Sequence, residues 1–457
     1  MSSPPTEAEA AKTGKSPHPA RPPWRDFGHL RRLFSDDVLG GLVFMHRKYG
    51  AFVRTRLPLH IYFLADPDAI EELLVKKPDS FRKHRTTRLL SRVIGNGLLA
   101  NEGESWRRQR RLLQPAFHQR HLQTYAALMV RAVERAAAGW RPGEVRDVHQ
   151  DMMRVTMTIV VESLFGAELS ADTEQVGQAI AELMVAFERF LGLAARFQPP
   201  AWVPTRANRR LRIAAGQIDA LVLRVIEQRK RDGAQGDDLL SLLIQARDED
   251  GGGMSDRQVR DEAVTLFLAG HETTALALSY ALYLLARHPT RQAQLADEVA
   301  RVLGGRPATF EDLPALSFTD NVVLETMRLY PPAWAIARQA LEPVEIAGFR
   351  LPRGAEFVMS PFVVHRDPRW FPDPEAFDPD RWRDDFARQL PRFAYFPFGG
   401  GPRVCIGNRF AMMEAKLVLA GLIQRFRFET TSDAALALQP SVTLRPRDGV
   451  RLGLISR

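Results

Sequence analysis

The only cysteine of this 457-residue chain, Cys405, stands in a run rich in glycine, Phe398-Gly-Gly-Gly-Pro-Arg-Val-Cys-Ile-Gly407. Such glycines let the backbone pass close to a large flat object and free amide groups to point at the sulfur. Residues 408–425 carry apolar side chains at helical spacing, so Cys405 precedes a helix N-terminus, whose positive end favours a thiolate. A metal-binding thiolate is one interpretation, and a small buried cysteine in a glycine loop is the other.

A second pattern, Ala269-Gly270-His271-Glu272-Thr273-Thr274, lies in the middle of a long predicted helix. Gly270 removes a side chain, so that a small molecule can fit against the helix. Thr273 can bond back to the preceding turn and locally open the helix, which leaves room for a water molecule. Glu272 then offers a relay from solvent to that water. The alternative is a helix with a surface glutamate and two ordinary threonines.

Two further pairs have spacings that place both members on one helix face. Glu325 and Arg328 are three residues apart and can bond directly; alone, such a pair is a solvated surface salt bridge of small energy. Trp106 and Arg110 are four residues apart, and both side chains can donate to one carboxylate. The alternative for that second pair is an amphipathic helix with a solvated basic face.

The elements that must position these residues are mainly helical. The longest helix is predicted to begin after Ser255, with Gln258 completing a capping box, and to end before His288-Pro289. Another is predicted from Thr319 to Tyr330, where Pro331-Pro332 ends it. The strand-like pieces are short, at residues 51–56, 61–64, 344–351 and 356–361. Residues 371–398 have no clear period, and so long an irregular stretch within a compact domain is usually functional.

Composition excludes several classes of protein. Apolar residues make up 45% and charged residues 26% of the chain, as in a globular protein. The net charge of +9 comes from basic residues spread along the chain without a nucleic-acid-binding motif, so an acidic partner protein is favoured over nucleic acid.

No apolar run reaches the roughly 18 residues of a membrane span. A single cysteine forms no intramolecular disulfide and suits the cytoplasm, where we expect the protein. Residues 1–23 read as a disordered leader.

The cysteine segment resembles the haem-binding loop of the cytochrome P450 family, Phe-x-x-Gly-x-Arg-x-Cys-x-Gly. The match is complete, at Phe398, Gly401, Arg403, Cys405 and Gly407. The resemblance runs from about residue 24 to residue 455, and it implies one catalytic domain over residues 24–457. It implies a mainly helical fold with a small β region, a triangular helical prism around a buried haem b. In that fold, Cys405 would be the axial ligand of the haem iron.

The other motifs occur in the order of the family. By this resemblance residues 269–274 lie over the distal face of the haem, where Gly270 would leave room for dioxygen. Glu325 and Arg328 would form a structural triad with Arg381. Trp106 and Arg110 would bind one haem propionate, and Arg338 and Arg403 the second. For His365, a turn-stabilising role is favoured over a propionate contact. Because motifs spread along the whole chain must meet around one haem, they cannot belong to separate domains.

The resemblance implies a monooxygenase that inserts one oxygen atom of dioxygen into an unactivated bond. Thr273, with a water fed through Glu272, would deliver protons. Electrons would come from NAD(P)H through a separate acidic ferredoxin or flavodoxin and its reductase. A basic patch containing Arg108, Arg111 and Arg409 would steer that partner by charge.

The substrate pocket implied by the resemblance is apolar, which favours a lipophilic substrate such as a fatty acid or a terpenoid. Its identity does not follow from the fold. A peroxide-driven peroxygenase or a haem-thiolate isomerase is the alternative enzyme class, and a non-enzymatic haem sensor or electron carrier is a further one. The expected pocket residues are Leu90, Val93, Phe187, Phe190, Phe267, Ala269, Ala333, Trp334, Ile336 and Val442.

Overall fold

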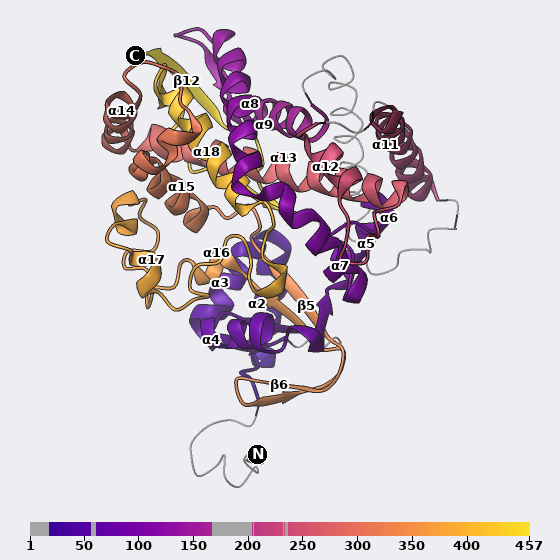
Figure 1. Ribbon diagram of the computed structural model, residues 1–457. Coiled ribbons are helices and arrows are strands. Elements are labelled where there is room, and N and C mark those ends of the chain that lie inside the picture. Colours follow the sequence, from indigo (N-terminus) through magenta and orange to yellow (C-terminus); the bar gives the residue numbers. More distant parts are fainter. Residues whose placement is uncertain (1–17, 56–60, 167–202, 204, 232, 234–235) are drawn as a thin grey trace. The chain divides into compact units, whose positions relative to one another are not determined.

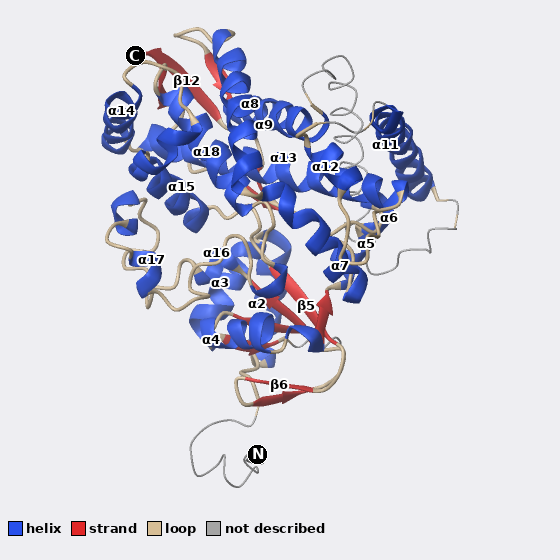
Figure 2. Ribbon diagram, viewed as in Figure 1, coloured by secondary structure: helices blue, strands red, loops and turns tan. Residues whose placement is uncertain are grey.

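The computed structural model describes residues 18–55, 61–166, 203, 205–231, 233 and 236–457 (Figure 1). Its described residues are mainly helical, with small sheets (Figure 2). The chain divides into two compact units, each formed from two separate stretches. The first holds residues 1–84 and 324–405, and the second holds residues 85–323 and 406–457. The predicted helical class with a small β region is therefore confirmed.

The first unit is built on a five-stranded sheet of order β1-β2-β8-β5-β3. Its central strands β2 and β8 run parallel, and the remaining neighbours pair antiparallel. A separate hairpin joins β6 and β7 through Ala347 and Gly348, so the predicted single strand over residues 344–351 is wrong. Both turn residues adopt a positive φ, which breaks a continuous strand there. The strands are β1 Phe52–Arg54, β2 Ile61–Leu64, β3 Phe81–Lys83, β5 Ile336–Ala340, β6 Val344–Ile346, β7 Phe349–Leu351 and β8 Glu356–Met359.

Short helices complete the first unit. Residues 371–398 form turns with two brief helical segments, as expected for a stretch without a clear period. Ala20, within the segment expected to be a disordered leader, forms a parallel β-bridge with Val53 of β1. The helices are α2 Trp24–Asp36, α3 Val38–Tyr49, α4 Pro67–Glu71, the π-helix η1 Glu72–Lys76, α16 Pro361–Val364 and α17 Phe386–Gln389, with 3₁₀ turns η2 Pro78–Ser80, η7 Pro379–Trp382 and η8 Gly401–Arg403.

The second unit is organised around α13, Asp256–Arg287, most of whose side chains are buried. Its start and end match the sequence prediction. Ser255 accepts a hydrogen bond from the Gln258 amide at 3.2 Å, which is one half of the predicted capping box. At the other end, His288 leaves helical geometry and Pro289 starts the next helix. Because α13 is 32 residues long, it presents side chains to several neighbouring helices of this unit.

The other helices of the second unit pack on α13 or on one another. They are α5 Arg85–Leu89, α6 Ser91–Ile94, α7 Gly103–Leu113, α8 Gln119–Ala138, α9 Val148–Phe165, α11 Arg206–Arg231, α12 Leu239–Gln245, α14 Pro289–Leu303, α18 Asn408–Ile423 and the 3₁₀ turns η3 Gln114–Phe117 and η6 Phe310–Ala315. The boundary between the units falls within α15, Ser317–Leu329, close to the predicted helix at 319–330. No helix among the described residues is both long and apolar enough to cross a membrane.

Two small sheets complete the second unit. One has the order β4-β12-β9, and the other is the β10-β11 hairpin. These strands lie outside the four strand-like pieces predicted from sequence. Their bounds are β4 Val145–Asp147, β9 Phe426–Thr430, β10 Leu438–Pro440, β11 Leu444–Pro446 and β12 Arg451–Ser456.

Candidate functional site

The segment around Cys405 is a tight loop of the first unit. The Cys405 amide donates to the Phe398 carbonyl at 3.0 Å, and this bond closes the loop. Inside it, the Val404 amide donates to the Gly401 carbonyl at 3.1 Å. Cys405 itself is exposed, so the interpretation as a small buried cysteine is wrong. A thiol presented on a closed loop is accessible to a large ligand.

Two glycines of this loop are required by the protein's own packing. A Cβ on Gly401 would lie 2.0 Å from the Leu74 carbonyl oxygen, and its φ of +67° disfavours any side chain. A Cβ on Gly400 would lie 2.3 Å from the ring of Phe393. These two positions therefore let the loop fold against neighbouring parts of the first unit. This reason differs from the close approach to a flat ligand that the sequence suggested.

Glu325 and Arg328 form a fully buried ion pair on α15 rather than a surface one. The Arg328 guanidinium donates to the two carboxylate oxygens at 2.8 and 2.9 Å, and both side chains are 0% exposed. Arg328 also donates to the carbonyls of His365, Pro374 and Ala376 at 3.0, 2.6 and 2.8 Å. These bonds satisfy a buried charge and tie α15 to the irregular stretch.

The expected third member of the triad, Arg381, lies beside the pair. Its Nε is 3.5 Å from Glu325 Oε1. Trp382, which the sequence reasoning missed, makes the shorter contact, because its indole Nε1 donates to Glu325 Oε2 at 2.9 Å. The Asp378 amide donates to Glu325 Oε1 at 3.0 Å. No feature of the sequence distinguished Trp382 from the other aromatic residues of this stretch.

His365 supports the same irregular stretch from within the first unit. It is 0% exposed, and its Nε2 accepts a hydrogen bond from the Phe396 amide at 2.9 Å. Burial, helped by the nearby Arg328 charge, holds the pKa of His365 well below its usual value, so the ring is neutral. This geometry agrees with the turn-stabilising role favoured from sequence.

The middle of α13 carries a partly exposed strip on an otherwise buried helix. Ala269 is exposed, and Gly270 and Thr273 are half-buried. The Thr273 hydroxyl donates to the Ala269 carbonyl at 2.7 Å, which is the predicted bond back to the preceding turn. The helix remains α-helical through this turn, so the predicted local opening is not seen. Because the Thr273 hydroxyl donates its proton to Ala269, the lone pairs of the Thr273 oxygen can accept hydrogen bonds on the exposed strip.

Gly270 has a packing role in the second unit. A Cβ there would lie 3.2 Å from Val160 Cγ2 of α9, tighter than an ordinary van der Waals contact. Gly270 therefore permits the close approach of α9 to α13. The sequence reasoning attributed this glycine to space for dioxygen alone, and it missed the neighbouring helix because the two segments are far apart in the chain.

Glu272 points into the protein. It is 6% exposed, accepts a hydrogen bond from the Thr443 hydroxyl at 2.6 Å and forms an ion pair with Arg445. Burial opposes its charge, but the bonds from Arg445 and Thr443 outweigh it and lower the pKa of Glu272. The alternative of a surface glutamate is therefore wrong, and Glu272 is a buried, ionised residue held by the β10-β11 hairpin. Sequence reasoning did not identify Thr443 or Arg445.

The four residues expected at the propionates lie on two elements and a loop. On α7, Trp106 is buried and Arg110 is half-buried. In the first unit, Arg338 lies on β5 and donates to the Ala337 carbonyl at 3.0 Å, and Arg403 is half-buried at the end of η8. The propionate contacts of these four residues remain a prediction.

The expected pocket residues differ in exposure. Phe267 is 1% exposed and its ring lies 5.9 Å from that of His271, so it belongs to the core of the second unit. Leu90 is also buried, whereas Ala269 and Val442 are exposed. Ala333, Trp334 and Ile336 of the first unit are half-buried. Phe187, Phe190 and the side chain of Val93 lie outside the described residues.

One of the three arginines expected to bind an acidic partner is engaged within the chain. Arg108 donates to Asp248 Oδ2 at 2.7 Å and to the carbonyls of Gly252 and Gly253. It therefore holds the glycine-rich loop that precedes α13. Arg111 and Arg409 are exposed, and their role in binding a partner stays a prediction.

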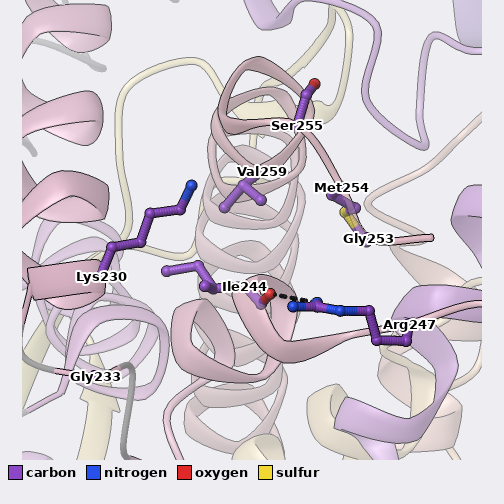
Figure 3. Close-up of a pocket in the computed structure, with 8 residues that line it drawn as sticks. All are labelled: Lys230, Gly233, Ile244, Arg247, Gly253, Met254, Ser255 and Val259. Carbon is purple, nitrogen blue, oxygen red and sulfur yellow. Dashed lines mark hydrogen bonds between the residues drawn. The ribbon is translucent and has the colours of Figure 1, made fainter. Parts of the chain in front are cut away.

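A cavity of about 470 Å³ lies elsewhere in the second unit, at the start of α13 (Figure 3). The two positively charged side chains that line it have partners within the chain. Lys230 pairs with Asp256, and Arg247 donates to the carbonyls of Ile244 and Ala246. The eight lining residues include none of the predicted site residues. They are Lys230, Gly233, Ile244, Arg247, Gly253, Met254, Ser255 and Val259.

The chain is similar to several known proteins. Residues 17–451 match the family model described as Cytochrome P450. A cyclooctatin synthase of Streptomyces melanosporofaciens is 37% identical over 404 residues, 87% of each chain. A pentalenene oxygenase of Streptomyces avermitilis is 37% identical over 369 residues, 80% of this chain and 81% of its own. The solved structure of retinoic acid-bound cyanobacterial CYP120A1 matches with a TM-score of 0.83 at 28% identity, covering 94% of this chain and 96% of its own.

Proposed function

Because this chain belongs to the cytochrome P450 family and is a monooxygenase of that family, we propose that it oxidises an apolar, terpenoid-like substrate. One oxygen atom of dioxygen would enter the substrate. The observation that carries the proposal is an exposed cysteine on a closed loop, backed in the same unit by a fully buried ion pair. Such a loop suits a permanent ligand, because its support is rigid and its thiol is accessible.

The residues present fit the haem that family membership implies. Cys405 would ligate the iron, and the loop from Phe398 to Gly407 would carry it. Trp106, Arg110, Arg338 and Arg403 would bind the two propionates, since two carboxylates inside a protein need cationic donors. When bound, the haem supplies iron whose thiolate ligand favours cleavage of the dioxygen bond. We also propose that residues 24–457 form a single catalytic domain.

Thr273 is proposed to place a water and to pass protons toward the reacting oxygen. Its hydroxyl proton is directed at the Ala269 carbonyl, so its oxygen can accept a hydrogen bond from a water on the exposed strip of α13. Glu272 would supply protons to that water from its buried position behind the helix face. The neighbouring glycine, Gly270, would leave room on this face for a small molecule.

The substrate class rests on the relatives and on the apolar residues expected around the pocket. One relative is named for oxidation of pentalenene, a hydrocarbon, and the solved relative is named for bound retinoic acid. A terpenoid is therefore favoured over a straight-chain fatty acid. Ala269 and Val442, which are exposed, and the half-buried Ala333, Trp334 and Ile336 would contact it.

Electrons are proposed to come from NAD(P)H through a separate acidic ferredoxin or flavodoxin and its reductase. The exposed Arg111 and Arg409 would attract such a partner. Screening of these charges by salt would slow reduction. The predicted cytoplasmic location is consistent with this source of electrons and remains part of the proposal.

Titration of the purified ferric protein with candidate substrates tests the substrate class. A substrate that displaces the iron-bound water shifts the haem absorption toward the high-spin form. We expect a saturable shift with cyclic terpene hydrocarbons and alcohols, and a weaker shift or none with long-chain fatty acids. A shift with fatty acids alone would refute the terpenoid assignment. Oxygen-dependent consumption of reductant in the same preparation would distinguish a monooxygenase from a peroxygenase, an isomerase or a haem sensor.

A further inference from the structure

The β10-β11 hairpin of the second unit is attached to α13 at three successive residues. The Thr443 hydroxyl donates to Glu272 Oε1 at 2.6 Å, and Arg445 forms an ion pair with the same oxygen. Between them, the Leu444 carbonyl accepts a hydrogen bond from the Tyr280 hydroxyl at 2.8 Å. Leu444 is 0% exposed, so the attachment is buried. The hairpin therefore has one fixed position on the helix, and that position places two donors on the glutamate.

The other ionisable groups near Glu272 add little to its charge balance. His271, its neighbour on α13, donates from Nε2 to the Met153 carbonyl at 3.1 Å, and His149 of α9 lies against Ser279 at 3.3 Å. Burial lowers the pKa of both histidines, so both rings are neutral near pH 7. Arg445 is consequently the cation that faces the carboxylate, with a side chain that is 24% exposed.

Burial of a carboxylate without a partner favours the protonated form. Removal of Arg445 would leave this effect of burial acting on Glu272, opposed among the described residues mainly by the hydrogen bond from Thr443. The ionisation state of Glu272 thus depends on a residue 173 positions away in the chain. A carboxylate locked in an ion pair is also a poor carrier of protons, since it must first separate from its cation.

We propose that the β10-β11 hairpin, through Thr443 and Arg445, fixes the position and charge of the Glu272 carboxylate and so governs when it can pass a proton toward Thr273. This inference rests on the relay role given to Glu272 in the proposed function. Thr443 and Arg445 act as positioning residues. They hold the Glu272 carboxylate in place, and neither needs to touch the substrate or the haem.

Replacement of Arg445 by Gln tests the proposal directly in the purified holoenzyme. The infrared carbonyl band of a protonated carboxyl group reports the state of Glu272 across a pH series. Burial raises the pKa of Glu414 well above its usual value, so Glu414 contributes a constant carbonyl band to every variant. At neutral pH we expect an additional band in Arg445→Gln, and no additional band in the wild type or in Arg445→Gln/Glu272→Gln. Arg445→Lys should remove the band again because it restores a cation. Thr443→Val should raise the pKa of Glu272 by less than Arg445→Gln does, because only one hydrogen bond is lost.

The coupling of reductant consumption to product gives the functional readout. In Arg445→Gln we expect a new pH-dependent step in coupling near neutral pH that disappears in the double variant. Arg427→Gln, which breaks the exposed ion pair with Glu429 on β9, is the matched control and should behave as wild type. The same carboxyl bands in Arg445→Gln as in the wild type would overturn the proposal. A band without any change in coupling would instead refute the relay role of Glu272 and support its positioning by the hairpin.

Discussion

The hydroxyl of Thr273 and the main-chain carbonyl of Ala269 are joined by a 2.7 Å hydrogen bond, one turn apart on the partly exposed strip of α13. The bond commits the only proton of the hydroxyl to the helix itself. The threonine oxygen is thereby presented as an acceptor at a fixed position. A water bound there would be oriented with a proton toward Thr273 and its second proton free.

Replacement of Thr273 by Ala should uncouple the enzyme. Without the hydroxyl acceptor, the water is no longer held, so proton delivery fails and reductant is consumed with release of hydrogen peroxide. The fraction of reductant recovered as product should fall about ten-fold or more, within the range ascribed to one positioned proton-transfer group. Thr158→Ala is the matched control, because Thr158 makes the same bond to the Arg154 carbonyl on α9. Full coupling in Thr273→Ala would remove Thr273 from the relay.

Loss of the buried Glu325–Arg328 pair should destabilise the protein strongly. Arg328→Ala leaves the Glu325 carboxylate buried with only the Trp382 and Asp378 donors and the more distant Arg381, which is expected to cost about 3–5 kcal/mol of unfolding free energy. Denaturant unfolding of the variant gives this value. Arg388→Ala breaks the exposed pair with Asp385 and should cost less than about 0.5 kcal/mol. Equal costs in the two variants would show that burial of the pair is energetically unimportant.

Gly401 and Gly354 provide a pair of substitutions that separates backbone strain from steric clash. Both have a positive φ, +67° and +83°, but a Cβ at Gly354 meets no atom within 4 Å, whereas at Gly401 it meets the Leu74 carbonyl. Gly354→Ala should therefore cost about 1–2 kcal/mol. Gly401→Ala should cost more than about 3 kcal/mol, because backbone must move. Similar unfolding free energies for the two variants would contradict the close approach of the cysteine loop to Leu74.

Asp312 makes stability depend on pH in the acid range. The Arg306 guanidinium, together with bonds from Thr309, lowers the pKa of Asp312 to about 2. A carboxyl whose folded pKa is depressed stabilises the protein above its ordinary value of 3.8, and this contribution is lost as the pH falls toward 2. Asp312→Asn should cost about 1 kcal/mol at neutral pH, as for loss of a helix cap, and less in acid. Urea unfolding at several pH values checks this, and a difference that stays constant with pH would refute it.

Local patterns predicted the elements well where a residue type acts on its own neighbourhood. Ser255 and the His288-Pro289 pair marked both ends of α13 because caps and proline act within one turn. The two-strand pairing of residues 344–351 was missed because a turn there needed Ala347 at a positive φ, which its residue type does not indicate. Strand β12 pairs with β4 and β9 across longer sequence separations, and no local period reveals such pairing.

The same division applies to the site. Glu325 and Arg328 could be paired from sequence because they share one helix face. Trp382 and Arg445 could not be assigned to their glutamates, because each contact joins residues from distant parts of the chain. Gly270 illustrates a further limit, since its missing side chain is explained by Val160 on another helix as well as by any ligand. Contacts between residues that are distant in the sequence can thus be identified only from the structure, whereas contacts within one helix can be predicted from residue spacing.

The absorption spectrum of the reduced, carbon monoxide-bound protein tests the central claim, thiolate ligation by Cys405, most directly. The wild type should show the strongly red-shifted Soret band of a thiolate-ligated haem. Cys405→Ser should lose that band, and Cys405→His should bind haem with the spectrum of an imidazole ligand, which shows that the loop still folds. A thiolate spectrum retained in Cys405→Ser would contradict the account.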